Sequence, residues 1–144
     1  MMGVMIALLV LGLAMKNNIN NSLSEMLREQ VSDKAISLSK TQIDSLYNYE
    51  KNNSAYEITF LEFGAKGCSA CKRMEGVMDI IRQKYGNTVN VVFINVVMPE
   101  NRNLMNYYGI AAIPTQVLLD KKGSEYFRHT GYIPADKLDK KFQW

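Results

Sequence analysis

The chain has 144 residues, and its 17 basic and 14 acidic side chains give a formal net charge of +3. This length suits one domain plus some additional sequence, and a hydrophobic fraction of 47% with 22% charged residues excludes a disordered, collagenous or coiled-coil protein. Basic residues are interleaved with acidic ones, so we expect no nucleic-acid partner. Two cysteines are too few for a disulfide-rich scaffold, and with one histidine they complete a structural zinc site only if carboxylates join them.

The first 15 residues carry no charged side chain, and the first charge is Lys16. As a helix they span about 22 Å, which is less than the roughly 30 Å of a membrane's hydrocarbon core. The length favours a signal peptide, with Gly12 and Ala14 as small residues before a cleavage site, although no basic residue precedes the run. A membrane anchor, the end of a longer anchor that starts upstream and a buried core helix are alternatives. We expect residues 1–15 to export the chain or tether it to a membrane, which places it in the periplasm or on the outer face of the cell membrane.

The next segment predicts a linker and a helical extension. Residues 16–21 (KNNINN) are polar and predict the linker. Ser22 and Glu25 have capping-box spacing at the start of a helical pattern that runs to about Asn53. A break is expected within residues 32–41, which are rich in Ser and Lys. We therefore divide the chain into a signal peptide or membrane anchor (1–15), a linker and helical extension (16–54) and a folded domain (55–144).

From residue 55 onward, short apolar runs alternate with helical patterns. We expect strands over 58–63, 89–97, 115–119 and 125–130, and helices over 68–85, 101–108 and 134–142. The near-continuous apolar run 89–97 is typical of a central strand covered on both faces, and Asp120 to Gly123 (DKKG) predicts a hairpin turn. The order β-α-β-α-β-β-α predicts an α/β fold, with a central mixed sheet flanked by helices.

The two cysteines, Cys68 and Cys71, follow an expected strand and open an expected helix. A CxxC in that context is typical of a redox motif. Free backbone N–H groups and the positive end of the helix dipole stabilise a thiolate there, which lowers the pKa of a thiol from its ordinary value of about 8.5. The spacing of three residues places both sulfurs on one turn, so a disulfide needs little backbone movement.

These features together resemble the thioredoxin superfamily, over about residues 56–142. The resemblance is carried by the CxxC after a strand, by Ile113-Pro114-Thr115 as the cis-proline loop, and by the closing hairpin followed by Gly131. The stretches FLEFGAKGCSACKRME and IPTQVLLDKKGSEYFRHTGY are most similar to small extracytoplasmic or membrane-tethered bacterial thioredoxin-like proteins.

The resemblance implies three catalytic roles. Cys68 is the attacking thiolate, and Cys71 is the more buried resolving thiol. Glu62, six residues before Cys68, is at the position of a buried acid. Burial raises the pKa of a carboxyl, so Glu62 suits a proton acceptor for Cys71.

Four further residues match the family's substrate groove. Pro114 is expected to be cis, and Ile113 to offer backbone hydrogen bonds to an extended substrate segment. Gly131 and Tyr132 match the loop beside that groove.

The chain departs from the family pattern around the cysteines. Glycine replaces an expected aromatic residue at Gly64 and at Gly67, which predicts a more open site. Ser69-Ala70 replaces the usual dipeptide between the cysteines, so a strongly reducing potential does not follow. A proline is also common where this chain has Gly76.

Other interpretations of the same residues stay open. One alternative is that the cysteines form a purely structural disulfide, and another is that they join His129 in a metal site. For Glu62 the alternative is a solvated acid on an edge strand, and for Pro114 it is an ordinary trans proline.

The resemblance implies a thiol–disulfide oxidoreductase that reduces protein disulfides outside the cytoplasm. It implies no metal, flavin or nucleotide cofactor beyond the redox-active disulfide, and a membrane thiol-reducing electron donor as partner. An oxidant or isomerase using the same site, and a non-catalytic binding module, are the alternatives.

Overall fold

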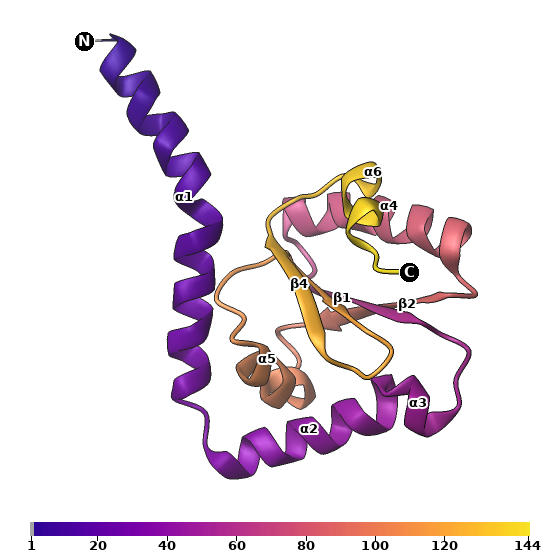
Figure 1. The fold of residues 1–144 in the computed structure, drawn as a ribbon. Coiled ribbons are helices and arrows are strands. Elements are labelled where there is room, and N and C mark those ends of the chain that lie inside the picture. The colour runs from indigo at the N-terminus through magenta and orange to yellow at the C-terminus, as the bar shows by residue number, and fades with distance from the viewer. Residues whose placement is uncertain (1) are drawn as a thin grey trace.

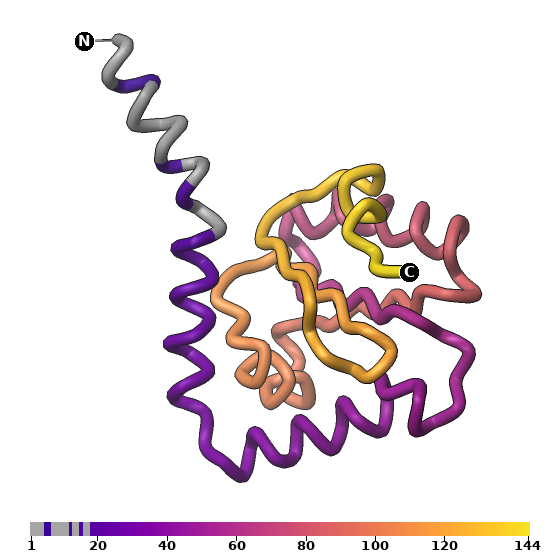
Figure 2. Tube along the Cα trace, in the orientation of Figure 1, coloured from indigo at the N-terminus to yellow at the C-terminus, as the bar shows by residue number. Residues whose placement is uncertain are grey.

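The computed structural model describes residues 2–144, without the side chains of residues 2–4, 7–11, 13, 14, 16 and 17 (grey in Figure 2, with residue 1). The expected signal peptide or anchor, residues 1–15, therefore lies largely outside the described side chains. Within the part of the chain that is described, no helix is both long enough and apolar enough to cross a membrane.

Helix α1 (Met2–Glu29) is longer than expected, because it runs through the segment that was expected to be a linker. Residues 16–21 are helical, and Ser22 lies inside the helix rather than at its cap. The segment holds no glycine or proline, so its asparagines cost a helix only a few tenths of a kcal/mol each, on the order given by helix propensities.

The break in the helical extension covers residues 30–32, so it overlaps the expected stretch 32–41 only at Ser32. Helix α2 (Asp33–Tyr47) begins after Ser32, whose hydroxyl accepts a hydrogen bond from the Ala35 N–H at 3.4 Å. This is ordinary N-cap chemistry. A single turn, α3 (Tyr49–Asn52), follows. Ile43 and Tyr47 of α2 are buried against the sheet, so the extension contributes to the core.

Four strands form one mixed sheet in the order β2-β1-β3-β4. Strand β1 (Ile58–Gly64) pairs parallel with β2 (Val89–Asn95) and antiparallel with β3 (Thr115–Leu119), which pairs antiparallel with β4 (Glu125–Thr130). The expectation that 89–97 is a central strand is wrong, because β2 lies at the edge and ends at Asn95. Its apolar run reflects helices on both faces of the sheet, and such cover makes even an edge strand apolar.

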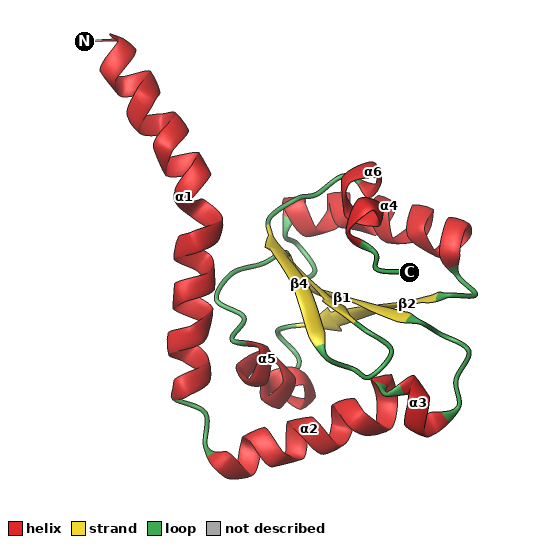
Figure 3. Cartoon of the chain, viewed as in Figure 1, coloured by secondary structure: helices red, strands yellow, loops and turns green. Residues whose placement is uncertain are grey.

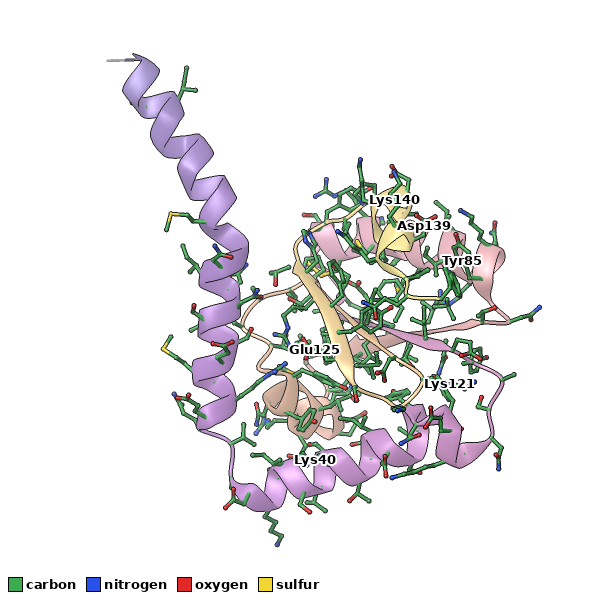
Figure 4. The ribbon with its side chains drawn as sticks, in the orientation of Figure 1. Lys40, Tyr85, Lys121, Glu125, Asp139 and Lys140 are labelled. Atoms are coloured by element: carbon green, nitrogen blue, oxygen red, sulfur yellow. A yellow bond between two sulfur atoms is a disulfide. The ribbon has the colours of Figure 1, made fainter. Side chains whose placement is uncertain are left out.

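Helices cover both faces, in the expected order of elements (Figure 1 and Figure 3). On one face lie α4 (Ser69–Tyr85) and the short α6 (Ala135–Leu138), which is followed by a 3₁₀ turn at Asp139–Lys141. The other face is covered by α2 and by α5 (Arg102–Tyr108), which a 3₁₀ turn at Pro99–Asn101 precedes. Each layer buries its own apolar cluster. The C-terminal segment is held to α4 by the Tyr85 hydroxyl, which donates to Asp139 at 3.2 Å (Figure 4).

The second half of α1 packs against β4 and against the end of α5. Glu125 of β4, labelled in Figure 4, accepts a hydrogen bond from Arg28 at 2.6 Å and another from Arg128 at 2.6 Å. Gly109 ends α5 with φ +57°, and a Cβ at that residue would collide with the backbone oxygen of Ser24. Only glycine combines this backbone conformation with so close an approach.

Candidate active site

The expected cysteine pair forms a disulfide at the start of α4. Cys68 is the N-cap residue and is half-buried, whereas Cys71 in the first turn is only 3% exposed. Their Cα atoms are 5.2 Å apart, and the Cys71 N–H donates to the Cys68 sulfur at 3.2 Å. The arrangement therefore leaves one cysteine partly exposed and keeps the other inside, at a helix start whose backbone donors stabilise a thiolate.

Glu62 lies in the middle of the sheet with no exposed surface. It belongs to β1, which has paired strands on both sides, so the alternative of a solvated edge acid is wrong. Gln116 Nε2 of β3 donates to its two carboxylate oxygens at 3.1 and 3.4 Å. Burial raises the pKa of Glu62 to about 8, and the hydrogen bond from Gln116 opposes that rise.

The sheet register places this carboxyl near the inner sulfur. Glu62 shares a face of β1 with Phe60 and Gly64, because alternate residues of a strand point the same way. Phe60 packs in the cluster beneath α4. A Cβ built on Gly64 would lie 3.4 Å from the Cys71 sulfur. Glu62 therefore lies on the face of β1 that the first turn of α4 covers, which is the face next to the Cys71 sulfur.

Phe93 fills the place where the family aromatic is missing. It pairs with Glu62 across β1 and β2, and its Cε2 atom lies 2.9 Å from where a Cβ on Gly64 would stand. The expected opening at Gly64 is therefore wrong, since another aromatic ring occupies the space from the neighbouring strand. At Gly67, whose φ is +88°, a Cβ would have nothing within 4 Å, so that side of the site is open as expected.

The expected substrate loop lies at the same end of the strands as the disulfide. The Ile113–Pro114 bond is cis, so the alternative of a trans proline is wrong. Thr115 pairs with Phe63 at the end of β1 that leads to Cys68, and the Gly131 N–H donates to the Pro114 carbonyl at 2.8 Å.

Tyr132 connects this loop to α4. The Arg73 guanidinium stands 4.8 Å from the centre of the Tyr132 ring, and the tyrosine is 41% exposed. Cation–π contact of this kind holds a ring in place. The four residues expected at a substrate groove are thus gathered around one end of the sheet; their roles in binding remain predictions.

The site has groups of the kinds that thiol–disulfide exchange uses: a half-buried cysteine, a buried second cysteine and a buried ionisable carboxyl. Among the residues the structure describes, no three His, Cys, Asp or Glu side chains lie close enough to hold a metal ion. Two residues of the site, Phe93 and Gln116, do not emerge from the motifs. The signal for Gln116 is its polarity inside the apolar strand 115–119.

A family of thioredoxin-like domains matches residues 45–143. Thioredoxin 1 of Synechococcus elongatus is 30% identical over 109 residues, which are 73% of this chain and 98% of that protein. The chloroplast thioredoxin-like protein HCF164 of Arabidopsis thaliana is 30% identical over 90 residues, which are 62% of this chain but only 34% of that protein.

A solved structure of similar fold is a thioredoxin from Halobacterium salinarum. It is 25% identical, with a TM-score of 0.56, and the match covers 69% of this chain and 79% of that one. This match and the strand order β2-β1-β3-β4 both support a thioredoxin fold.

Proposed function

The chain belongs to the thioredoxin-like family, and on that premise we propose that it is a thiol–disulfide oxidoreductase that reduces disulfides of protein substrates. The observation that carries the proposal is the pair itself: a half-buried Cys68 at the start of α4, joined to a buried Cys71.

In the first step, the Cys68 thiolate attacks one sulfur of a substrate disulfide. A mixed disulfide between Cys68 and the substrate forms, and the other substrate sulfur leaves with the bonding electron pair. Ile113, beside the cis bond, and the loop at Gly131 and Tyr132 hold the extended substrate segment.

In the second step, Cys71 gives its proton to the Glu62 carboxylate, directly or through one water. The resulting thiolate attacks the Cys68 sulfur, and the remaining substrate sulfur leaves as a thiolate. Two electrons have then passed from the dithiol to the substrate, and the Cys68–Cys71 disulfide is the oxidised product. No cofactor besides this disulfide takes part.

A turnover assay tests this function on the full chain. Insulin disulfides should be reduced in the presence of dithiothreitol, and the Cys68→Ser variant should be inactive. An inactive wild type whose disulfide is readily reduced would favour a non-catalytic binding module instead. A reduction potential of about −270 mV supports a reductase, whereas one of about −120 mV points to an oxidant.

We further propose that the chain works outside the cytoplasm, held at a membrane by residues 1–15, and that a membrane thiol-reducing protein resupplies its electrons. The apolar run of residues 1–15, which ends before Lys16, supports the tether. A membrane-impermeant maleimide should label reduced Cys68 in intact cells, and removal of residues 1–15 should release the protein from the membrane fraction. Labelling only after lysis would contradict the location.

A further inference from the structure

A row of four side chains crosses the sheet beneath α4, one from each strand. Phe93 of β2 pairs with Glu62 of β1, Glu62 pairs with Gln116 of β3, and Gln116 pairs with His129 of β4. Directly paired residues point to the same face of a sheet. The carboxyl is therefore held between a phenyl ring and an amide.

Gln116 is an unusual residue for this position. It has no exposed surface, and its neighbours Val117 and Leu118 are equally buried. Burying an amide is costly unless its polar atoms are paired. Its Nε2 atom donates to both oxygens of Glu62, while its Oε1 atom is buried and has no hydrogen-bond partner among the described residues. The NH₂ group of the amide is thus bound to the carboxylate, and its carbonyl oxygen is left without a donor among the described residues.

We propose that Gln116 is a positioning residue for the release of substrate, because its amide stabilises the Glu62 carboxylate that takes the proton from Cys71. Hydrogen bonds to an ionised acceptor are stronger than those to a neutral one, so the amide favours the form of Glu62 that can act as a base. Once Glu62 carries the proton, its O–H needs an acceptor, and a rotation of the amide presents Oε1. The inference rests on the proposed function, in which Glu62 is that base.

Few other charged groups face this carboxyl. Phe93 borders it on β2, and from α4 the buried side chains Cys71 and Met74 face the sheet. The charged residues of that part of α4, Lys72, Arg73 and Glu75, are exposed. On β4, His129 is separated from Glu62 by Gln116. The amide is therefore the polar group placed to control ionisation of Glu62.

Replacement of the amide by a thioether of similar length tests the role. In Gln116→Met, the pH midpoint of the release step should rise by about one unit, so release at pH 7 should slow by about tenfold. The first attack by Cys68 should be unchanged, and release rates should converge at a pH above both midpoints. Leu118→Met, two residues along on the same face, is the matched control and should leave the midpoint in place. Release that slows equally at every pH, or a midpoint equal to that of the control, would overturn the inference.

Two further measurements separate this role from a defect in folding or in the proposed function. The carboxyl ¹³C signal of Glu62 in the oxidised full chain should titrate at higher pH in Gln116→Met and, in the same direction, in the shorter Gln116→Asn. In a Glu62→Gln background, Gln116→Met should not slow release further. An inactive wild type would defeat the proposed function and, with it, the role of Gln116 in release, whereas an unshifted carboxyl titration in an active protein would defeat this inference alone.

Discussion

Strand β1 carries two buried polar side chains on opposite faces. One is neutral and fully paired, and the other is ionisable and held by a single amide. Towards α3, the Thr59 hydroxyl lies 2.5 Å from the Tyr49 hydroxyl, which also accepts a hydrogen bond from Asn90 at 3.0 Å. These neutral groups satisfy one another. Towards α4, Glu62 is ionisable and relies on Gln116, whose Oε1 has no partner among the described residues. We infer that the first group stabilises the fold and that the second serves the chemistry at the disulfide.

The largest expected effect is on the α4 face, where loss of the inner sulfur should stop turnover. Cys71→Ser should accumulate mixed disulfides through Cys68, because no thiol remains to resolve them. Non-reducing gels of the tagged full chain check this. Cys68→Ser is the control and should form none, and equal adducts in both variants would reverse the assigned roles.

The next effect concerns the buried base. Glu62→Gln keeps the shape of the side chain but removes its basicity, so release should slow by about 10–100-fold, the usual worth of general-base catalysis. The attack by Cys68 should change much less. Since burial raises the pKa of Glu62 to about 8, wild-type release should quicken as pH rises towards that value. Stopped-flow kinetics separate the two steps, and release that is independent of pH between 6 and 9 would rule out Glu62 as the acceptor.

Motifs close in sequence made much of this site predictable. The redox pair follows from a local pattern, whereas the burial of Glu62 and the cis bond at Pro114 were implied by the resemblance to the thioredoxin superfamily. Gln116 and Phe93 were missed because they come from other strands, and sheet register brings them to the carboxyl across 54 residues in the case of Gln116. Local patterns do not encode that register.

Two elements of the fold were misjudged for a related reason. An apolar run indicates that a strand is covered on both faces, but it does not indicate where in the sheet the strand lies. For this reason β2 was expected at the centre. The asparagine-rich residues 16–21 were expected to form a linker from their polarity, yet a helix already formed on one side continues through them.

Of the two buried polar groups on β1, only the one that contains Glu62 should make the free energy of unfolding depend on pH. The folded chain holds the Glu62 proton up to a pH of about 8, whereas the unfolded chain loses it near the ordinary glutamate pKa of 4.5. Between these values the folded state binds more protons, so the free energy of unfolding falls as pH rises. The slope reaches about 1.4 kcal/mol per pH unit at most. Urea unfolding of the oxidised chain at pH 5, 6, 7 and 8 checks this, and Glu62→Gln should lack that slope. Parallel pH profiles for the two proteins would contradict the burial of an ionisable Glu62.

The smallest effect on activity is expected on the other face. Tyr49 is 3% exposed, and Tyr49→Phe deprives both Thr59 and Asn90 of a hydrogen-bond partner. An unsatisfied buried polar group costs about 1–3 kcal/mol, so the free energy of unfolding should fall by about that amount, equally at pH 5 and pH 8. The control is Tyr56→Phe, because Tyr56 packs its ring 5.5 Å from that of Tyr49 but makes no hydroxyl hydrogen bond among the described residues. Release kinetics and their pH midpoint should match wild type in both variants, since no ionisable group of the disulfide face has changed. If Tyr49→Phe shifted that midpoint, the two faces of β1 would be coupled, and the division between a stabilising face and a chemical face would fail.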